Sequence, residues 1–97
     1  MSIINNLNKA FDHRIRLGIM SVLVVNITED FKTLKELLNA TDGNLASHLK
    51  ALEKEGYITV EKKFIGRKPN TSYTISELGR FEFKKHIDAI EKLIKKK

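Results

Sequence analysis

Residues 41–56, with the sequence TDGNLASHLKALEKEG, predict a short amphipathic helix with well-defined ends. Thr41 and Asp42 are both favourable N-cap residues, and Gly56 can end a helix in the left-handed conformation. Between these ends, leucines recur at the i, i+4, i+7 spacing of one buried face, namely Leu45, Leu49 and Leu52. We therefore predict a helix over residues 42–55 that packs these leucines on a small core.

The opposite face of this helix is small, polar and basic. At about 100° per residue, it carries Gly43, Asn44, Ser47, Lys50, Ala51 and Lys54. Hydroxyl, amide and amine groups of this kind can reach a base edge or a phosphate, and no bulky side chain prevents close approach. The helix alone is equally consistent with an ordinary amphipathic surface helix, since such helices are common. Its neighbours in the chain therefore decide the interpretation.

Two further helices are predicted before this stretch. Apolar residues at helical spacing indicate a first helix over residues 8–24 and a short second helix over residues 33–39. Residues 26–30 are polar and acidic, and are predicted to form a loop. Only Ala40 and Thr41 separate the second helix from the third, which is the spacing of a helix-turn-helix.

After the third helix, the pattern changes to a period of two residues. Residues 57–65 and 71–76 are rich in β-branched and aromatic side chains, and residues 66–70 between them contain a glycine and a proline. This predicts a hairpin over residues 57–76 with a basic tip. Ser76 is then a suitable N-cap for a long final helix beginning at Glu77.

Taken in order, these elements resemble the winged helix-turn-helix of the MarR and ArsR groups of transcriptional regulators, and in particular their short stand-alone members. DHRIRLGIM (12–20) is similar to their opening helix, and LASHLKALEKEGYI (45–58) to their recognition helix and the start of the wing. GRKP (66–69) and YTISELGR (73–80) resemble the wing and the start of the last helix. The resemblance covers nearly the whole chain, and the order and spacing of the motifs carry it.

The expected architecture is a single α+β domain over residues 1–97, mainly α with a small β-hairpin. It comprises a three-helix core, a wing, and a long C-terminal dimerisation helix with a basic tail over residues 77–97. Two departures from those families stand out. The chain has no Cys for the thiolate metal sites of many ArsR-type sensors, and no room for the extra helices that frame ligand pockets in full-length MarR-type proteins.

In such folds the third helix enters the DNA major groove. Asn44, Ser47 and Lys50 are the candidates for contacts with base edges, because amides pair with adenine and amines with guanine or a phosphate. Lys54 lies farther from the start of the helix and is expected to meet a phosphate. His48 lies between the polar and apolar faces, so local packing and DNA contact are both open; the resemblance favours contact.

The predicted wing supplies the second part of this site. In winged folds the wing reaches the DNA backbone or the adjoining minor groove, and Arg67 and Lys68 at its tip are the candidates for that contact. The alternative is that both are solvated charges of an ordinary turn.

The final helix predicts a homodimer. Four apolar residues spaced 4, 3 and 4 apart form a coiled-coil-like seam: Phe83, Ile87, Ile90 and Ile94. Leu78 and Phe81 lie on a different face, which is predicted to pack on the core of the same chain. The alternative for the seam is intramolecular packing against the first helix. Two-fold symmetry would place two recognition helices about 34 Å apart on a palindromic site.

The charge balance favours an anionic partner. The chain has 18 Lys plus Arg against 12 Asp plus Glu, a net charge of +6. Double-stranded DNA is the first expectation, with a membrane surface or an acidic protein second. Residues 95–97, all lysine, supply three of the six net charges and are expected to add non-specific attraction.

An enzyme is not expected, and neither is a cofactor. The three histidines share no metal-binding spacing, and the sequence contains no Gly-rich phosphate loop or nucleophile motif. A metal sensor built from His86, Asp88 and Glu91 would need two chains, because these residues do not share one helix face. No small-molecule effector can be named from the sequence.

The main alternative is a winged helix that binds another protein and not DNA, since a fold does not dictate a function. The basic recognition face, without an aromatic or aliphatic anchor, favours DNA. We expect a cytoplasmic location, because no signal peptide or membrane span is apparent and the absence of Cys fits a reducing compartment.

Overall fold

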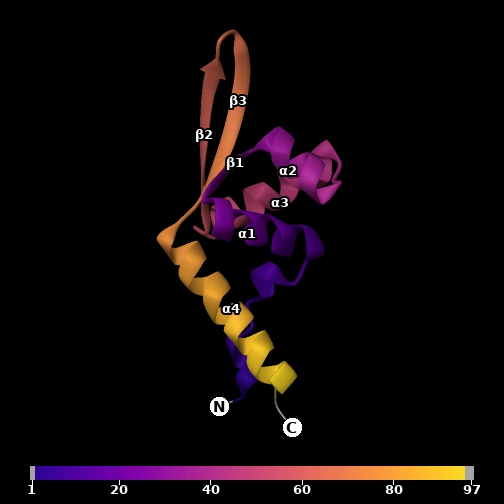
Figure 1. Cartoon of the computed structure of the whole chain (residues 1–97), viewed down its shortest axis with the longest axis vertical. Coiled ribbons are helices and arrows are strands. Elements are labelled where there is room, and N and C mark those ends of the chain that lie inside the picture. Colours follow the sequence, from indigo (N-terminus) through magenta and orange to yellow (C-terminus); the bar gives the residue numbers. More distant parts are fainter. Residues whose placement is uncertain (1, 96–97) are drawn as a thin grey trace.

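The computed structural model describes residues 2–95 and extends over 56 × 25 × 21 Å. A helical body lies in the middle, with a hairpin and the last helix projecting from it in opposite directions (Figure 1). In chain order the elements are η1 (Ile3–Asn6), η2 (Lys9–Phe11), α1 (Arg14–Asn26), β1 (Thr28–Asp30), α2 (Phe31–Leu38), α3 (Asp42–Lys54), β2 (Ile58–Ile65), β3 (Lys68–Ile75) and α4 (Glu77–Lys95). This is the predicted α+β architecture. Lys96 and Lys97 of the expected basic tail lie outside the described residues.

The helix-turn-helix prediction is confirmed, although α2 begins at Phe31, two residues before the predicted start at residue 33. The left-handed backbone of Asn39 ends α2, and Thr41 caps α3 by accepting a hydrogen bond from the backbone N–H of Asn44 at 3.2 Å. Gly56, with φ of 84°, follows the last turn of α3. All three leucines of the predicted inner face are buried: Leu45, Leu49 and Leu52. Local capping and periodicity therefore suffice to define this helix.

The first helix starts later than the sequence predicts, at Arg14 and not near residue 8. The side chain of Asn8 accepts a hydrogen bond from the N–H of Ala10 at 2.8 Å, and His13 Nδ1 accepts one from the N–H of Ile15 at 3.1 Å. Each of these side chains starts a new helical segment, so the chain before α1 forms short 3-10 turns and no continuous α-helix.

The predicted loop over residues 26–30 is wrong at Thr28–Asp30, which form β1. This strand pairs antiparallel with β3, with Thr28 opposite Thr74 and their hydroxyl oxygens 2.8 Å apart. Thr28–Asp30 have no apolar alternation, so their extended conformation comes from the long-range pairing with β3. Asp30 also caps α2, and the hydrogen bond from the N–H of Thr33 holds the pKa of its carboxyl below the usual range.

The sheet has the strand order β1-β3-β2. Strands β2 and β3 pair along their whole length, from Ile58 opposite Ile75 to Ile65 opposite Lys68. The turn is therefore shorter than the predicted residues 66–70, because β3 begins at Lys68. The inner half of this hairpin packs on the body, whereas every residue from 61 to 69 is exposed.

The core gathers around Phe11. Its ring contacts Tyr57 at 5.4 Å between centroids and Phe83 edge-on at 5.3 Å. The other buried apolar side chains of α1, α2, α3 and the sheet join the same cluster: Ile19, Met20, Leu23, Leu34, Leu45, Leu49, Leu52, Ile58, Tyr73 and Ile75. One core therefore holds the wing, the helix-turn-helix and the start of α4 together.

The inward face of α4 is not the one predicted. Gly79, Phe83, His86 and Ala89 face the protein, while Leu78 and Phe81, predicted to pack on the core, are 49% and 64% exposed. Helical periodicity shows which residues share a face, and it does not show which of two apolar faces turns inward.

The start of α4 is tied tightly to the root of the wing. Ser76 donates its backbone N–H to the carbonyl of Tyr57 at 3.0 Å and its hydroxyl to the carbonyl of Gly56 at 2.6 Å. Its hydroxyl oxygen accepts the N–H of Gly79 at 2.9 Å. A Cβ at Gly79 would collide with the Tyr57 carbonyl, so only glycine allows this approach.

The N-terminal segment lies alongside α4 (Figure 1). The backbone N–H of Asn8 donates to Nδ1 of the buried His86 at 2.9 Å. Burial lowers the pKa of His86, although the carboxylate of Asp12 opposes this shift.

None of the helices within residues 2–95 has both the length and the apolar character needed to span a membrane.

Candidate nucleic-acid interface

The outer face of α3 is a polar, basic surface. Four of the predicted contact residues are exposed on it: Asn44, Ser47, Lys50 and Lys54. All thirteen residues of α3 are described by the structure, and none of them is an exposed large apolar side chain. The structure therefore brings these four residues to one accessible face, as expected.

One acidic residue lies at the start of this surface. Asp42 is exposed in the first turn of α3, where a carboxylate is favourable beside the helix N-terminus. Its Oδ1 lies 2.8 Å from Nζ of Lys35 on α2. This ion pair offsets the negative charge that Asp42 would otherwise present beside Asn44.

His48 differs from the other predicted contacts because it is half-buried between α3 and α1. Arg16 Nε donates to His48 Nδ1 at 3.0 Å, and the His13 ring lies 3.9 Å from the His48 ring between centroids. Burial lowers the pKa of His48, and the positive charges of His13 and Arg16 lower it further. These contacts are the local packing that the sequence left open, and DNA contact by His48 stays a prediction. Sequence analysis missed Arg16 and His13, because the pattern of α3 carries no information about residues far upstream.

The tip of the wing presents Arg67 and Lys68, both exposed as predicted. Lys62 and Lys63 on β2 are exposed as well, and sequence analysis did not name them. Their position near the end of the predicted strand, two residues before the predicted turn, was the available signal. Among residues 2–95, none of the ion pairs involves these four cations.

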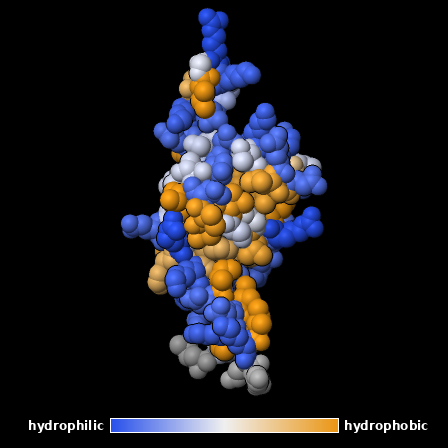
Figure 2. Space-filling view, in the orientation of Figure 1, coloured by the Kyte–Doolittle hydropathy of each residue, from blue (hydrophilic) through white to orange (hydrophobic). Residues whose placement is uncertain are grey.

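The wing tip also carries apolar side chains. Phe64 and Ile65 are 72% and 61% exposed although both residue types usually lie inside proteins. In Figure 2, hydrophobic groups appear near the end of the hairpin among hydrophilic ones. The sequence predicted these residues to be part of a strand and gave no reason to expect them beyond the core.

The four residues of the predicted dimer seam on α4 differ in exposure. Phe83 is 4% exposed and packs within its own chain, and Ile90 is half-buried. Ile87 and Ile94 are 41% and 76% exposed. A mainly apolar groove of about 430 Å³ follows this face where α4 meets α1, lined by Val24, Arg80, Phe83, Lys84, Ile87 and Asp88.

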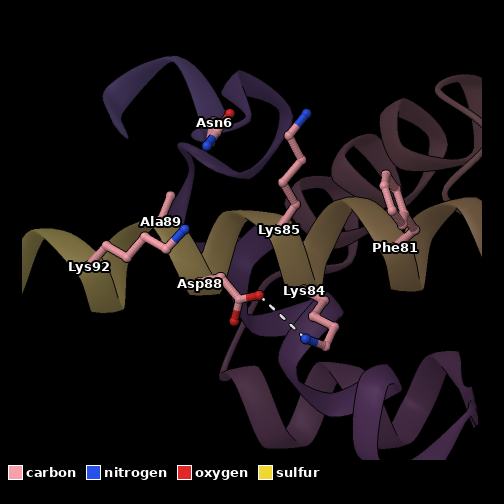
Figure 3. Close-up of a pocket in the computed structure, with 7 residues that line it drawn as sticks. All are labelled: Asn6, Phe81, Lys84, Lys85, Asp88, Ala89 and Lys92. Carbon is pink, nitrogen blue, oxygen red and sulfur yellow. Dashed lines mark hydrogen bonds and ion pairs between the residues drawn. The ribbon is translucent and has the colours of Figure 1, made fainter. Parts of the chain in front are cut away.

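A second hollow, of about 280 Å³, lies between the N-terminal segment and another face of α4 (Figure 3). Lys84 and Lys85 project to opposite sides of the helix there, and Lys84 Nζ lies 3.3 Å from Asp88 Oδ2. Because the cations do not converge, the hollow lacks the polar arrangement of a built ligand site.

The hypothetical metal site on α4 gains no support from the described residues. His86 is buried and its Nδ1 already accepts the N–H of Asn8, whereas Asp88 is exposed and pairs with Lys84. Within residues 2–95, no cluster of three or more His, Asp or Glu side chains is placed to hold a metal ion.

Comparisons with known proteins agree with this geometry. A family model described as a winged helix DNA-binding domain matches residues 15–94. An uncharacterized protein of Methanocaldococcus jannaschii is 39% identical over 87 residues, which cover 90% of this chain and 95% of that protein.

Solved structures give the same result. The transcriptional regulator homologue protein from Pyrococcus horikoshii OT3 is 30% identical with a TM-score of 0.82, over 88% of this chain and 84% of that chain. The structure of overoxidized AbfR bound to DNA has a TM-score of 0.77 at 15% identity, over 97% of this chain and 68% of that chain, and shares the fold. The resemblance seen in the sequence is thereby confirmed.

Proposed function

The chain belongs to the family of winged-helix DNA-binding domains, and on that premise we propose that it is a sequence-specific transcriptional regulator that binds double-stranded DNA as a homodimer. The observation that carries the proposal is the outer face of α3, which is polar, basic and without an exposed apolar anchor. A helix that docks on another protein usually presents such an anchor. The same observation therefore ranks the protein-interaction alternative second.

In this proposal, α3 lies in the major groove. Asn44, Ser47 and Lys50 occupy the first and middle turns of the helix, where recognition helices contact base edges. An amide pairs with adenine and an amine with guanine. Lys54, in the last turn, meets a phosphate and fixes the position of the helix on the duplex.

The wing supplies the contact with the backbone and the adjoining minor groove. Its exposed half, residues 61–69, extends beyond the body, and Arg67 and Lys68 are at its end. Arginine and lysine at such a tip neutralise phosphates or enter a narrow minor groove. This contact adds affinity that depends strongly on salt.

Dimerisation in this proposal uses the apolar side of α4. Ile87 and Ile94 are exposed, Ile90 is half-buried, and Phe83 lines the inner end of the adjacent groove. Within the described residues Ile87 and Ile94 are exposed to water, and a second copy of the chain would cover them. A two-fold axis through α4 would then present two copies of α3 to a palindromic duplex.

Binding to a labelled pool of random duplex DNA, at low and at physiological salt, tests this proposal. We expect steeply salt-dependent binding and enrichment of a palindrome. The variant Arg67→Glu/Lys68→Glu should bind at least about tenfold more weakly and lower the log–log salt slope by about 2. The matched control is Lys85→Glu/Lys92→Glu, which changes the net charge equally on α4.

Equal losses in both variants would assign the effect to net charge and remove the wing from the site. Absence of binding at low salt would overturn DNA recognition and favour the protein-interaction alternative.

A further inference from the structure

The exposed apolar pair at the wing tip has no role in the contacts described so far. Phe64 and Ile65 lie within the stretch 61–69, in which every residue is exposed. A protruding hairpin with apolar side chains at its end invites aggregation, and natural edge strands usually avoid it. We therefore expect a partner molecule to cover the apolar side chains at the wing tip.

The strand register shows which apolar groups act together. Phe64 lies opposite Pro69, and Ile65 lies opposite Lys68. A two-residue turn is closed by a hydrogen-bonded pair, so the next pair outward from the turn, Phe64 and Pro69, is a non-hydrogen-bonded one. Side chains are closer in such pairs, and the missing N–H of proline breaks no ladder bond there. Phe64 and Pro69 thus form one apolar face of the tip, and Ile65 lies on the opposite face.

The Phe64–Pro69 face is on the same side of the sheet as the recognition helix. Strand side chains alternate with a period of two, so Phe64 shares its face with Val60, which lies opposite Tyr73. Val60 and Tyr73 pack on the core, the same core that holds the leucines of α3. A duplex that contacts α3 and the wing together would meet Phe64 and not Ile65.

The charges around the tip fit a nucleic acid. Lys62 shares the face of Phe64, and Arg67 lies in the turn beside it. Lys63 and Lys68 lie on the opposite face with Ile65. Glu61 is the only acidic residue in 61–69. Long cationic side chains on both faces of a narrow hairpin tip can reach the two phosphate strands that border a groove. Phenylalanine and proline are among the side chains that enter the minor groove, separate two stacked base pairs and bend the duplex.

We propose that the Phe64–Pro69 pair is an apolar wedge that enters the minor groove and opens one base step, while the flanking cations hold the phosphates. This inference rests on the proposed function and adds a source of sequence preference to it. Pyrimidine–purine steps unstack most easily, so the wedge would favour such a step at a fixed distance from the bases read by α3.

The test compares Phe64→Ala with the matched control Ile65→Ala. A short duplex enriched from the random pool by the wild-type protein carries a donor and an acceptor dye at its ends, which report the bend. Phe64→Ala should bind about tenfold more weakly, leave the salt slope unchanged and reduce the bend. Ile65→Ala should stay within about twofold of the wild type in affinity and keep the bend. Both side chains are exposed, so both variants should keep the melting temperature.

The outcomes separate the wedge from the proposed function. If the wild type binds and Phe64→Ala matches it in affinity and bend, the wedge is overturned and DNA recognition stands. Loss of self-association by Phe64→Ala in sedimentation without DNA would assign the tip to a contact between copies and also overturn the wedge. A wild type that binds no duplex overturns both proposals together.

Discussion

Helices α3 and α4 use their apolar residues in opposite ways. In α3 the three leucines are buried in the chain's own core and the outer face is polar. In α4, Phe83 and Ala89 are buried, but Phe81, Ile87 and Ile94 remain exposed. The first helix is complete within one chain and presents a surface suited to a polar partner. The second leaves apolar side chains exposed, and the proposed homodimer would cover the face that carries Ile87 and Ile94.

The largest expected effect is the loss of folding stability when a buried leucine of α3 is shortened. Leu49→Ala should lower the free energy of unfolding by about 3 kcal/mol, because it leaves a cavity in a closed core. Phe81→Ala on α4 removes a larger side chain, yet should change the free energy by no more than about 0.5 kcal/mol. Urea unfolding of both variants checks the contrast. A comparable loss in Phe81→Ala would show that a partner covers this face of α4.

A second, smaller effect concerns assembly. Ile87→Asp/Ile90→Asp should weaken the homodimer by about a hundredfold, because carboxylates would enter an apolar interface. The control is Leu78→Asp/Phe81→Asp, the same kind of change on the other apolar face of α4, which should leave the dimer intact. Sedimentation measures both, and circular dichroism checks that the helices persist. Monomers from the control and a dimer from the first variant would move the interface to the other face.

The smallest expected effect is on pH dependence. Burial lowers the pKa of His86 on α4 and of His48 beside α3. Below the unfolded pKa of about 6.5, the unfolded chain therefore binds more protons than the native one, and stability falls as pH falls. His86 is the more buried and loses its acceptor for the Asn8 N–H on protonation of Nδ1, so it should contribute more.

Urea unfolding between pH 7 and 5 checks this ranking. His86→Gln should flatten the decline of stability with falling pH more than His48→Gln does. An unchanged decline in His86→Gln would show that its imidazole does not titrate as inferred.

The sequence predicts α3 well because its ends and its buried face are local properties: Thr41, Gly56 and the leucine spacing are all present within one stretch. It predicts the start of α4 at Glu77 for the same reason, because the capping residue Ser76 is local. It does not predict which face of α4 turns inward, because that depends on Phe11 and on the approach of Gly79 to Tyr57, both distant in sequence. The sequence does not predict strand β1, because β1 is defined only by its pairing with β3.

The candidate site divides in the same way. Asn44, Ser47, Lys50 and Lys54 could be found from periodicity, and Arg67 and Lys68 from turn chemistry. The contacts of His48 with Arg16 and His13 depend on how α1 crosses α3. The exposure of Phe64 depends on how far the hairpin extends past the core, which strand propensity does not encode.

The junction of Ser76 and Gly79 with residues 56 and 57 has a mechanical consequence. Because these hydrogen bonds and the close approach of Gly79 join the start of α4 to the base of the wing, we expect the two elements to tilt together about Tyr57. The eight residues of β2 span about 23 Å. A shared tilt of about 10° would move the wing tip by about 4 Å over that length, so in the proposed homodimer the angle between the subunits would set the positions of both wing tips.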